Sequence, residues 1–211
     1  MAKKDAETTS VDLMVDLIIS LDGYASAEGW PGWWGLEGPE YLAWLEQESE
    51  KEYTFLMGAN TYRLMSGMSE QAAAEESEFS DDEGAALTGL AAVPKVVFSS
   101  SLQGPLTWPN SELVSGDPVE AVTEMKRTRT RPLSTLGSLS LCRTLMTAGL
   151  VDRFRLVVFP VITGRTGRER IYDGYPDISL EMVDSRTFDG RLQLLEYVPT
   201  VLSGPPDSDP K

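Results

Sequence analysis

The sequence predicts one three-layer α/β domain with a mostly parallel central sheet and a C-terminal antiparallel hairpin. Apolar, β-branched runs of strand length alternate with helical patterns along most of the chain. Two of these runs end in a glycine that leads directly into a helix, in FLMGANTY and STLGSLSL. The last two strand-like runs are joined by Asp189-Gly190, a pair that favours a hairpin turn. Together these observations are typical of an α/β fold with an antiparallel edge.

The first half of the chain is predicted to contain three strands and two helices. Its first strand is apolar except for Asp12 and Asp16, and Asp22-Gly23 marks the turn that follows. Proline in the first turn supports the first helix. The predicted elements are a strand at residues 11–20, a helix at 39–51, a strand at 53–57, a short helix capped by Asn60 or Thr61 that ends near residue 65, and a strand at 95–99.

The second half continues the alternation and then changes to the hairpin. We find no internal linker or repeat, so we predict one domain at residues 11–199 between disordered ends at 1–10 and 200–211. The predicted elements are a strand at residues 112–115, a helix from 117 to about 129, a strand at 133–136, a helix at 138–148, a strand at 154–162, and hairpin strands at 178–185 and 191–198.

Length and composition are those of an ordinary globular domain, with 211 residues of which 41% are hydrophobic. No apolar core follows the lysines of MAKKDAETTS, and LVVFPVI is too short to cross a bilayer. We therefore expect neither a signal peptide nor a membrane span. The single cysteine, Cys142, cannot form an internal disulfide, lies among apolar helix positions and fits a cytoplasmic location.

Charge excludes several classes of function. A net charge of −15 repels nucleic acid and anionic membranes, so we expect neither as a partner. Residues 70–84 hold seven acidic residues and no basic one, which predicts a solvated loop or frayed helix. The chain has no histidine, which removes imidazole metal sites and histidine triads, and we predict no metal. Chemistry supplied by a cofactor becomes more attractive for that reason.

The two strand–glycine–helix junctions predict a place for phosphate groups. Ligands of open α/β sheets bind at the carboxyl ends of the strands, and helix N-termini attract anions there. Gly58 and Gly137 would let the backbone approach a ligand, and Thr61, Ser138 and Ser140 would add hydroxyl donors. Either junction alone is an ordinary helix start, and the pair together leaves two interpretations open, a dinucleotide phosphate site or two ordinary helix starts. The GxGxxG fingerprint and the P-loop are both absent.

Six motifs in order resemble a known family. SLDGYAS, LAWL, LMGANTY, PKVVFSSSL, LGSLSLCRTLMTAGLVD and FRLVVFPVITG look like the reductase domain at the C-terminus of bacterial riboflavin-pathway deaminase-reductases, which is similar to dihydrofolate reductase. The resemblance implies a dihydrofolate-reductase-like fold, NADPH or NADH as cofactor, and a homodimer. It also implies an NAD(P)H-dependent oxidoreductase that transfers hydride to a C=N or C=O of a small pyrimidine- or pteridine-like substrate.

The resemblance also assigns cofactor contacts to residues of this chain. The family's phosphate-contacting turn corresponds to the junction at Gly58, and its pyrophosphate site to the junction at Gly137. Its adenosine contacts correspond to the end of the third strand, at Ser99. A strand-to-loop segment with Asp22 and Gly23 would lie beside the nicotinamide and the substrate. The cofactor-binding residues implied in this way are Ala25, Gly58, Ala59, Asn60, Thr61, Ser99, Ser100, Gly137, Ser138 and Leu139.

The chain departs from the family at both ends of the site. Ala59 and Ser100 stand where arginines are common, and arginine is the usual partner of a 2′-phosphate, so the choice between NADPH and NADH stays open. Residues 165 and 168, or the segment 126–131, are alternative sources of a guanidinium. Tyr41 stands where dihydrofolate reductases carry a carboxylate, and folate is not favoured as the substrate. The candidate proton donors are Asp22, Glu40, Tyr41 or an ordered water.

The loop GWPGWWG precedes the PEYLAWL helix, where the family has an active-site lid. We expect Trp30, Trp33 and Trp34 to cover the substrate pocket, with at least one of them packed on that helix instead. Two other functions fit the sequence. One is a ligand-binding or sequestering protein on the same scaffold, and the other is an interaction module that uses the acidic residues 70–84.

Overall fold

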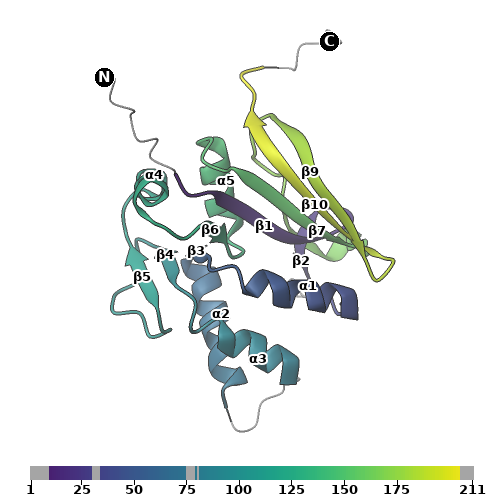
Figure 1. Cartoon of the computed structure of the whole chain (residues 1–211), viewed down its shortest axis with the longest axis horizontal. Helices are drawn as coiled ribbons and strands as arrows, with labels where there is room; N and C mark the ends of the chain where they lie inside the picture. Colours follow the sequence, from purple (N-terminus) through teal and green to yellow (C-terminus); the bar gives the residue numbers. More distant parts are fainter. Residues whose placement is uncertain (1–9, 30–33, 75–78, 80, 205–211) are drawn as a thin grey trace, which may run out of the picture.

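The computed structural model describes residues 10–29, 34–74, 79 and 81–204. Its centre is an eight-stranded sheet with the order β5-β4-β3-β6-β1-β7-β10-β9 (Figure 1). β10 is antiparallel to both neighbours, and the other pairs are parallel, which confirms the predicted fold class. The strands are β1 (Leu13–Ser20), β3 (Thr54–Gly58), β4 (Lys95–Phe98), β5 (Ser111–Val114), β6 (Leu133–Thr135), β7 (Arg153–Phe159), β9 (Ile178–Phe188) and β10 (Leu192–Val201).

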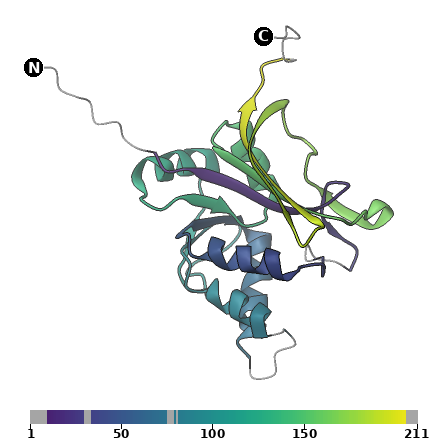
Figure 2. The ribbon, with the colours of Figure 1, turned by 45° about the vertical axis from the view of Figure 1, so that its right-hand side comes forward.

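Helices cover both faces of this sheet (Figure 1, Figure 2). One face carries α1 over the β1–β7 region and α2 over β3 and β4, with α3 packed beside α2. The opposite face carries α4 and α5, so the domain has three layers. The helices are α1 (Pro39–Ser49), α2 (Ala59–Ala72), α3 (Asp81–Gly89), α4 (Pro118–Thr128) and α5 (Leu139–Thr147).

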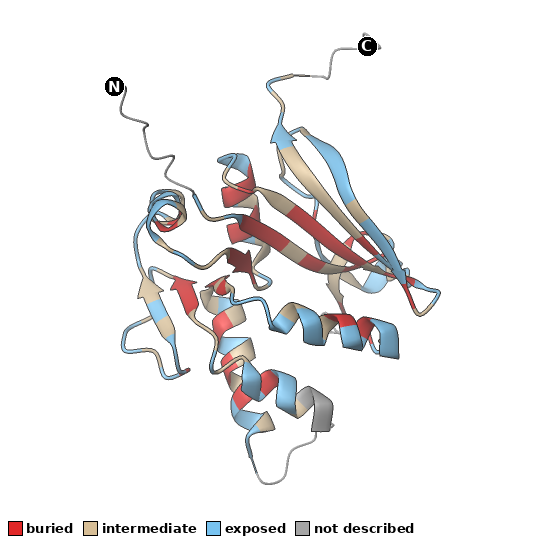
Figure 3. Ribbon diagram, viewed as in Figure 1, coloured by how far each residue is buried: buried red, intermediate tan, exposed pale blue. Residues whose placement is uncertain are grey.

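The apolar core follows the alternation of side chains along the central strands. Leu13, Val15, Leu17 and Ile19 of β1 all point to the α4–α5 face and are buried in one cluster. The opposite face holds two smaller clusters, one under α1 and one under α2. Figure 3 shows buried residues concentrated in the central strands and exposed residues along β9 at the edge. Cys142 is fully buried beneath α5, as its apolar neighbours predict.

The strand order places a switch point at β6. The chain runs from β1 through α1 to β3, continues outward to β4 and β5, and returns through α4 to insert β6 between β3 and β1. α2 leaves the end of β3 on one face, and α5 leaves the end of β6 on the other. Neighbouring strand ends whose chains leave in opposite directions create the crevice in which α/β proteins bind ligands.

Several predicted boundaries are wrong. α2 does not end near residue 65 but continues to Ala72, and α3 begins at Asp81, so much of the acidic segment is helical. Asn60 and Thr61 lie inside α2, and Gly58 is its N-cap residue. The helix begins earlier than predicted because Gly58, the last residue of β3, is also the N-cap, so Ala59 is already helical. β7 ends at Phe159, since Pro160 has no N–H for the strand ladder.

The sequence also failed to predict a second, two-stranded sheet. β2 (Tyr24–Ala27) pairs antiparallel with β8 (Gly167–Arg170), and the short helix η1 (Gly164–Thr166) precedes β8. Both strands are only four residues long, β2 (YASA) is made mostly of small residues and β8 (GRER) is mostly charged, so neither has the apolar alternation of a strand. β10 runs to Val201, which pairs with Ile178, and thus passes the predicted domain boundary at residue 199. The predicted loose N-terminus falls almost entirely outside the described residues.

Candidate active site

The two predicted phosphate junctions form one site. β3 and β6 are neighbouring strands, so their carboxyl ends lie side by side. The N–H of Gly58 donates to the hydroxyl oxygen of Ser138 at 2.7 Å, and the hydroxyl groups of Ser138 and Thr61 are also 2.7 Å apart. These bonds join the start of α2 to the start of α5. The structure therefore brings together the residues around Gly58 and Gly137, as the sequence predicts.

The N-termini of α2 and α5 lack the carboxylates found on two other helices. Asp189 accepts hydrogen bonds from the N–H groups of Glu40 and Tyr41 at the start of α1. Asp117 accepts one from Val119 at the start of α4. Among the described residues, no side chain caps α2 or α5 in this way. The two adjoining helix ends thus leave N–H donors and positive dipole ends for an anion.

The backbone at the start of α5 is left-handed at two consecutive residues. Gly137 has φ +55° and Ser138 has φ +62°. Residues other than glycine avoid this region, at a cost of about 1–3 kcal/mol. A Cβ at position 137 would lie 3.3 Å from the hydroxyl oxygen of Thr61, so glycine also permits close contact between the two junctions. Strain of this kind is common at ligand sites.

The third strand end lies next to the first junction, because β4 pairs with β3. The hydroxyl of Ser99 accepts hydrogen bonds from the N–H groups of Ser101 and Leu102, and so stabilises its own turn. Ser100 is exposed. The amide oxygen of Asn60 accepts a hydrogen bond from Arg63 one turn further along α2, at 3.2 Å. Arg63 therefore lies beside Asn60, one of the predicted cofactor-binding residues, and its position was not recognised from the sequence.

The alternative arginine sources lie elsewhere. Arg168 is on β8 and pairs with Glu28, and Arg165 is in η1. The basic residues of the segment 126–131 are used in ion pairs that involve no residue of the junction. These pairs are Lys126–Asp152, Arg127–Glu124, Arg129–Glu112 and Arg131–Glu52.

Asp22 follows β1, and its carboxylate is held by the loop after β7. It accepts hydrogen bonds from the hydroxyl of Ser20 at 2.7 Å and from the N–H groups of Gly164 at 2.8 Å and Thr163 at 3.2 Å. Desolvation acts to raise the pKa of Asp22, but these hydrogen bonds outweigh it and lower the pKa to about 2. Asp22 is therefore ionised at neutral pH, which does not suit the predicted role of proton donor.

Glu40 is engaged in capping. Its carboxylate accepts a hydrogen bond from the N–H of Asp189 at 2.6 Å, while the carboxylate of Asp189 accepts from the first N–H groups of α1. The exchange resembles a capping box formed between two distant segments. It attaches α1 to the β9–β10 hairpin. The contacts of Glu40 are thus those of a structural residue, and its catalytic role stays a prediction without geometric support.

Tyr41 lies inside the core and not on an open surface. It is 1% exposed and packs on the rings of Trp44, Phe159 and Phe188. Its hydroxyl has no hydrogen-bond partner among the described residues, which costs about 1–3 kcal/mol in a buried site. Burial, together with the carboxylates of Asp16 and Glu37, raises the pKa of the phenol, so donation of a proton becomes harder.

The aromatic loop is described only in part. Trp30 and Trp33 lie outside the described residues. Trp34 is 1% exposed and packs in the cluster beneath α1 with Tyr41 and Trp44. The expectation that at least one tryptophan packs on this helix is confirmed. Burial does not suit the predicted substrate-covering role of Trp34, because the indole is already covered by protein.

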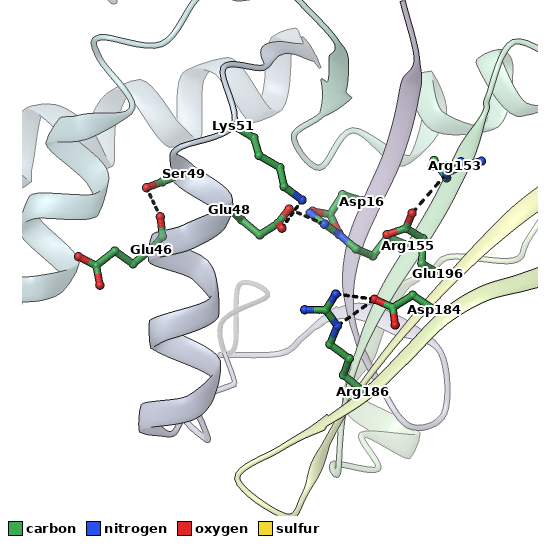
Figure 4. A network of polar contacts seen from close by, with 10 residues as sticks. All are labelled: Asp16, Glu46, Glu48, Ser49, Lys51, Arg153, Arg155, Asp184, Arg186 and Glu196. Carbon is green, nitrogen blue, oxygen red and sulfur yellow. Dashed lines mark hydrogen bonds and ion pairs between the residues drawn. The ribbon is translucent and has the colours of Figure 1, made fainter.

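An ionic network centred on the buried Arg155 was not predicted from the sequence (Figure 4). Arg155 of β7 donates to Asp16 of β1 and to Glu48 of α1, both at 2.6 Å. Its guanidinium also lies over the ring of Trp44. Figure 4 shows it between the two carboxylates, with Lys51 approaching Glu48 from the other side. The available signal was an aspartate at position 16 inside an otherwise apolar strand.

A family model for the RibD C-terminal domain matches residues 12–194. The chain belongs to the RibD C-terminal domain family. It is also 27% identical over 188 residues to YyaP, an uncharacterized protein of Bacillus subtilis (strain 168), which covers 88% of this chain and 93% of YyaP. The family confirms the resemblance that the six sequence motifs indicate.

Solved structures from this family have the same fold. A pyrimidine reductase-like protein of Corynebacterium diphtheriae superposes with a TM-score of 0.60 at 17% identity, covering 91% of this chain and 93% of the other. A diaminohydroxyphosphoribosylaminopyrimidine deaminase/5-amino-6-(5-phosphoribosylamino)uracil reductase of Thermotoga maritima gives 0.61 at 15% identity, covering 90% of this chain and 57% of that one. The chain thus spans little more than half of the Thermotoga protein.

No helix in the described part of the chain is long and apolar enough to cross a membrane. Within the same residues, no group of three or more Cys, Asp or Glu side chains is arranged to hold a metal ion.

Proposed function

We propose that this chain is an NAD(P)H-dependent oxidoreductase that transfers hydride to a C=N or C=O carbon of a small pyrimidine- or pteridine-like heterocycle. The observation that carries the proposal is the junction where α2 and α5 begin together without side-chain caps. Family membership supports it. The substrate that we propose for the first test is 5-amino-6-(5-phosphoribosylamino)uracil, which the name of the Thermotoga relative contains.

The residues at the junction fit a dinucleotide. The N–H groups at the start of α2 and α5 would bind the pyrophosphate, and Gly58 and Gly137 would let it approach the backbone. Ser99 and Ser100 would lie along the adenosine, at the end of the neighbouring strand. Ala25 on β2 would lie beside the nicotinamide. When bound, the nicotinamide supplies the hydride, while the chain orients the two reactants and excludes water.

A proton must reach the heteroatom next to the reduced carbon. Asp22 is ionised with a pKa of about 2, Glu40 is used in capping, and burial raises the pKa of Tyr41. These contacts leave an ordered water as the proton source that we propose. In this proposal Asp22 orients the loop after β7 at the edge of the site.

The test is substrate-dependent oxidation of the cofactor. The purified protein is mixed with NADPH or NADH and 5-amino-6-(5-phosphoribosylamino)uracil, and the absorbance of the reduced nicotinamide is followed. We expect oxidation that needs protein, cofactor and substrate together. A chain that binds the heterocycle but neither dinucleotide would instead be the ligand-binding protein that the missing arginines at positions 59 and 100 suggest.

We propose as well that the chain forms a homodimer through the outer end of its sheet. β9 and β10 pair Val201 with Ile178 and Pro199 with Leu180, which places these side chains on one face. Leu180, Met182 and Val201 are exposed on that face. A second copy would present the same row of apolar side chains, as a two-fold interface requires.

A further inference from the structure

Asp16 lies beside the junction on the face that carries α1 and α2. β1 pairs Leu13 with Leu133 and Met14 with Ser134, so Asp16 is level with Leu136, directly before the glycine of the second junction. Its neighbours Val15 and Leu17 point into the core under α4 and α5, and Asp16 points to the opposite face. The side chain of Asp16 is 28% exposed although β1 is a central strand. A carboxylate is therefore accessible next to the proposed cofactor site.

Arg155 orients the Asp16 carboxylate by bonding to one of its two oxygens. The guanidinium donates to Oδ2 of Asp16 at 2.6 Å, and no described residue donates to Oδ1 (Figure 4). Arg155 is 5% exposed, and its second carboxylate partner, Glu48, holds it from the side of α1. The Nε–H of Arg155 has no hydrogen-bond partner among the described residues.

Two more buried polar atoms lack partners, and one belongs to Tyr41, which packs on the same Trp44 ring as Arg155. These are the hydroxyl of Tyr41 and Oε1 of Glu37, which no described residue satisfies. The charges of Asp16, Glu37 and Arg155 all act on the Tyr41 hydroxyl, so each of the three lies within electrostatic range of that hydroxyl. Buried polar groups are normally hydrogen-bonded, and several unmet groups beside one accessible carboxylate indicate a ligand that completes them.

We infer that Asp16, oriented by Arg155, and the hydroxyl of Tyr41 bind the hydrogen-bonding edge of the substrate ring. The inference rests on the proposed function and names the residues that recognise the substrate. A carboxylate only accepts hydrogen bonds, so Asp16 requires ring or exocyclic N–H donors. The Tyr41 hydroxyl can donate to a neighbouring carbonyl oxygen or ring nitrogen. The ligand is thus a neutral, flat heterocycle with both donors and an acceptor on one edge.

The charges near the cluster also orient the ligand. Asp16 and Glu37 would repel a phosphate group, so a phosphorylated substrate would point its phosphate away from them.

The alternative is that Asp16, Arg155 and Tyr41 only stabilise the fold and bind no substrate ring. In that case, removal of the Tyr41 hydroxyl would change the stability of the protein without changing any affinity.

The test measures binding of 5,6-diaminouracil to the NADPH-saturated protein by titration calorimetry. A matched probe, 1,3-dimethyl-5,6-diaminouracil, keeps the ring and amino groups but loses both ring N–H donors. We expect the dimethyl compound to bind the wild type about tenfold more weakly. Asp16→Asn should weaken binding of 5,6-diaminouracil about tenfold, and Tyr41→Phe about fivefold, with the affinity for NADPH unchanged.

Tyr62→Phe is the matched control. Its hydroxyl is also buried but accepts hydrogen bonds from the N–H groups of Thr107 and Trp108. Tyr62→Phe should lower the melting temperature and leave binding of 5,6-diaminouracil unchanged. Tyr41→Phe removes a hydroxyl without a partner, so its melting temperature should stay the same or rise. Tyr41→Phe therefore tests the inference even if Asp16→Asn does not fold.

The outcomes separate the inference from the proposed function. If the wild type does not bind NADPH, the proposed function fails. If NADPH binds but 5,6-diaminouracil does not, or binds wild type, Asp16→Asn and Tyr41→Phe alike, the inference is overturned and the reductase proposal stands.

Discussion

Asp22 shows how the surroundings of one residue decide its chemistry. The Asp-Gly pair predicts a turn, and Gly23 with φ +86° confirms it. That the loop after β7 donates to the carboxylate was not predictable, because Thr163 and Gly164 are 141 and 142 residues away along the chain. A group that the motif places near the substrate is thus an ionised anchor, with a pKa of about 2.

Asp22→Asn should lower stability at neutral pH. The pKa of Asp22 is lower in the folded chain than its ordinary value of 3.8, so its contribution is complete above about pH 4 and is lost as the pH falls towards 2. Since the side chain is only partly buried and solvent screens it, we expect a loss of only about 1 kcal/mol at pH 7. Urea unfolding at pH 7 and pH 2.5 measures it. An equal difference between the two proteins at both pH values would contradict this account.

Arg63 is predicted to set the cofactor preference. It lies exposed beside Asn60, one of the predicted cofactor-binding residues, while Ala59 and Ser100 carry no charge. Arg63→Gln should weaken NADPH binding about tenfold and leave NADH binding unchanged, because only NADPH carries the 2′-phosphate. Fluorescence titration with both dinucleotides measures this. Arg127→Gln on α4 is the control, and equal losses for the two cofactors would exclude a 2′-phosphate contact.

At the residue scale, the sequence predicted glycines and hydroxyls better than charged side chains. Gly58, Thr61, Gly137 and Ser138 follow from the order of strand, glycine and helix, which is a local pattern. The partners of Asp16 do not, since Arg155 and Glu48 are brought to it by strand pairing and by the packing of α1. Electrostatic environments depend on such distant contacts and cannot be derived from spacing.

At the scale of elements, Asp189 connects two distant parts of the fold. It lies at the hairpin turn that the sequence predicts, with φ +53°, and its carboxylate caps α1. Gly38 must be glycine for the same reason, because a Cβ there would come within 2.2 Å of the Asp189 side chain. The turn was predictable from its Asp-Gly pair. The capping was not, because the helix and its cap are far apart in sequence.

Asp189→Ala should destabilise the protein by about 1 kcal/mol, the usual cost of losing a helix cap. Because α1 carries Tyr41, we also expect weaker binding of 5,6-diaminouracil to the NADPH-saturated protein. Asp117→Ala removes the comparable cap of α4 and serves as the control. It should cost a similar amount of stability and leave ring binding unchanged. Chemical unfolding and calorimetry make both comparisons, and equal effects on ring binding would remove α1 from the substrate site.

Most elements were predictable because their hydrophobic patterns are local and strong. The long β1 and the amphipathic α4 and α5 fall close to their expected ranges. β2 and β8 were not predicted, since two four-residue strands without an apolar pattern pair only after β1 and β7 bring them together. The full length of α2 was missed because Gly67 and several small polar residues weaken its helical pattern, whereas Tyr62, Ser66 and Ser69 are buried in the structure.

At the scale of the molecule, the outer end of the sheet is predicted to be an interface. Met182 on β9 is 53% exposed and shares its face with Leu180 and Val201. Met182→Glu should convert the proposed homodimer to a monomer while leaving the fold intact, because a charge on this face opposes a two-fold apolar contact. Sedimentation measures the mass of each form. Glu181→Lys, on the other face of β9, is the control, and a wild-type monomer would exclude the dimer.

The central claim is that the junction of α2 and α5 holds a dinucleotide. Titration calorimetry with NADPH tests it most directly, with the wild type beside Gly137→Ala. Alanine at position 137 is strained at φ +55° and places a Cβ 3.3 Å from Thr61, so it should disturb the junction at its centre. We predict a Kd below about 100 μM for the wild type and binding at least about tenfold weaker for a folded Gly137→Ala. Absence of NADPH and NADH binding to the wild type at millimolar concentration, or equal affinity in both proteins, would contradict the account.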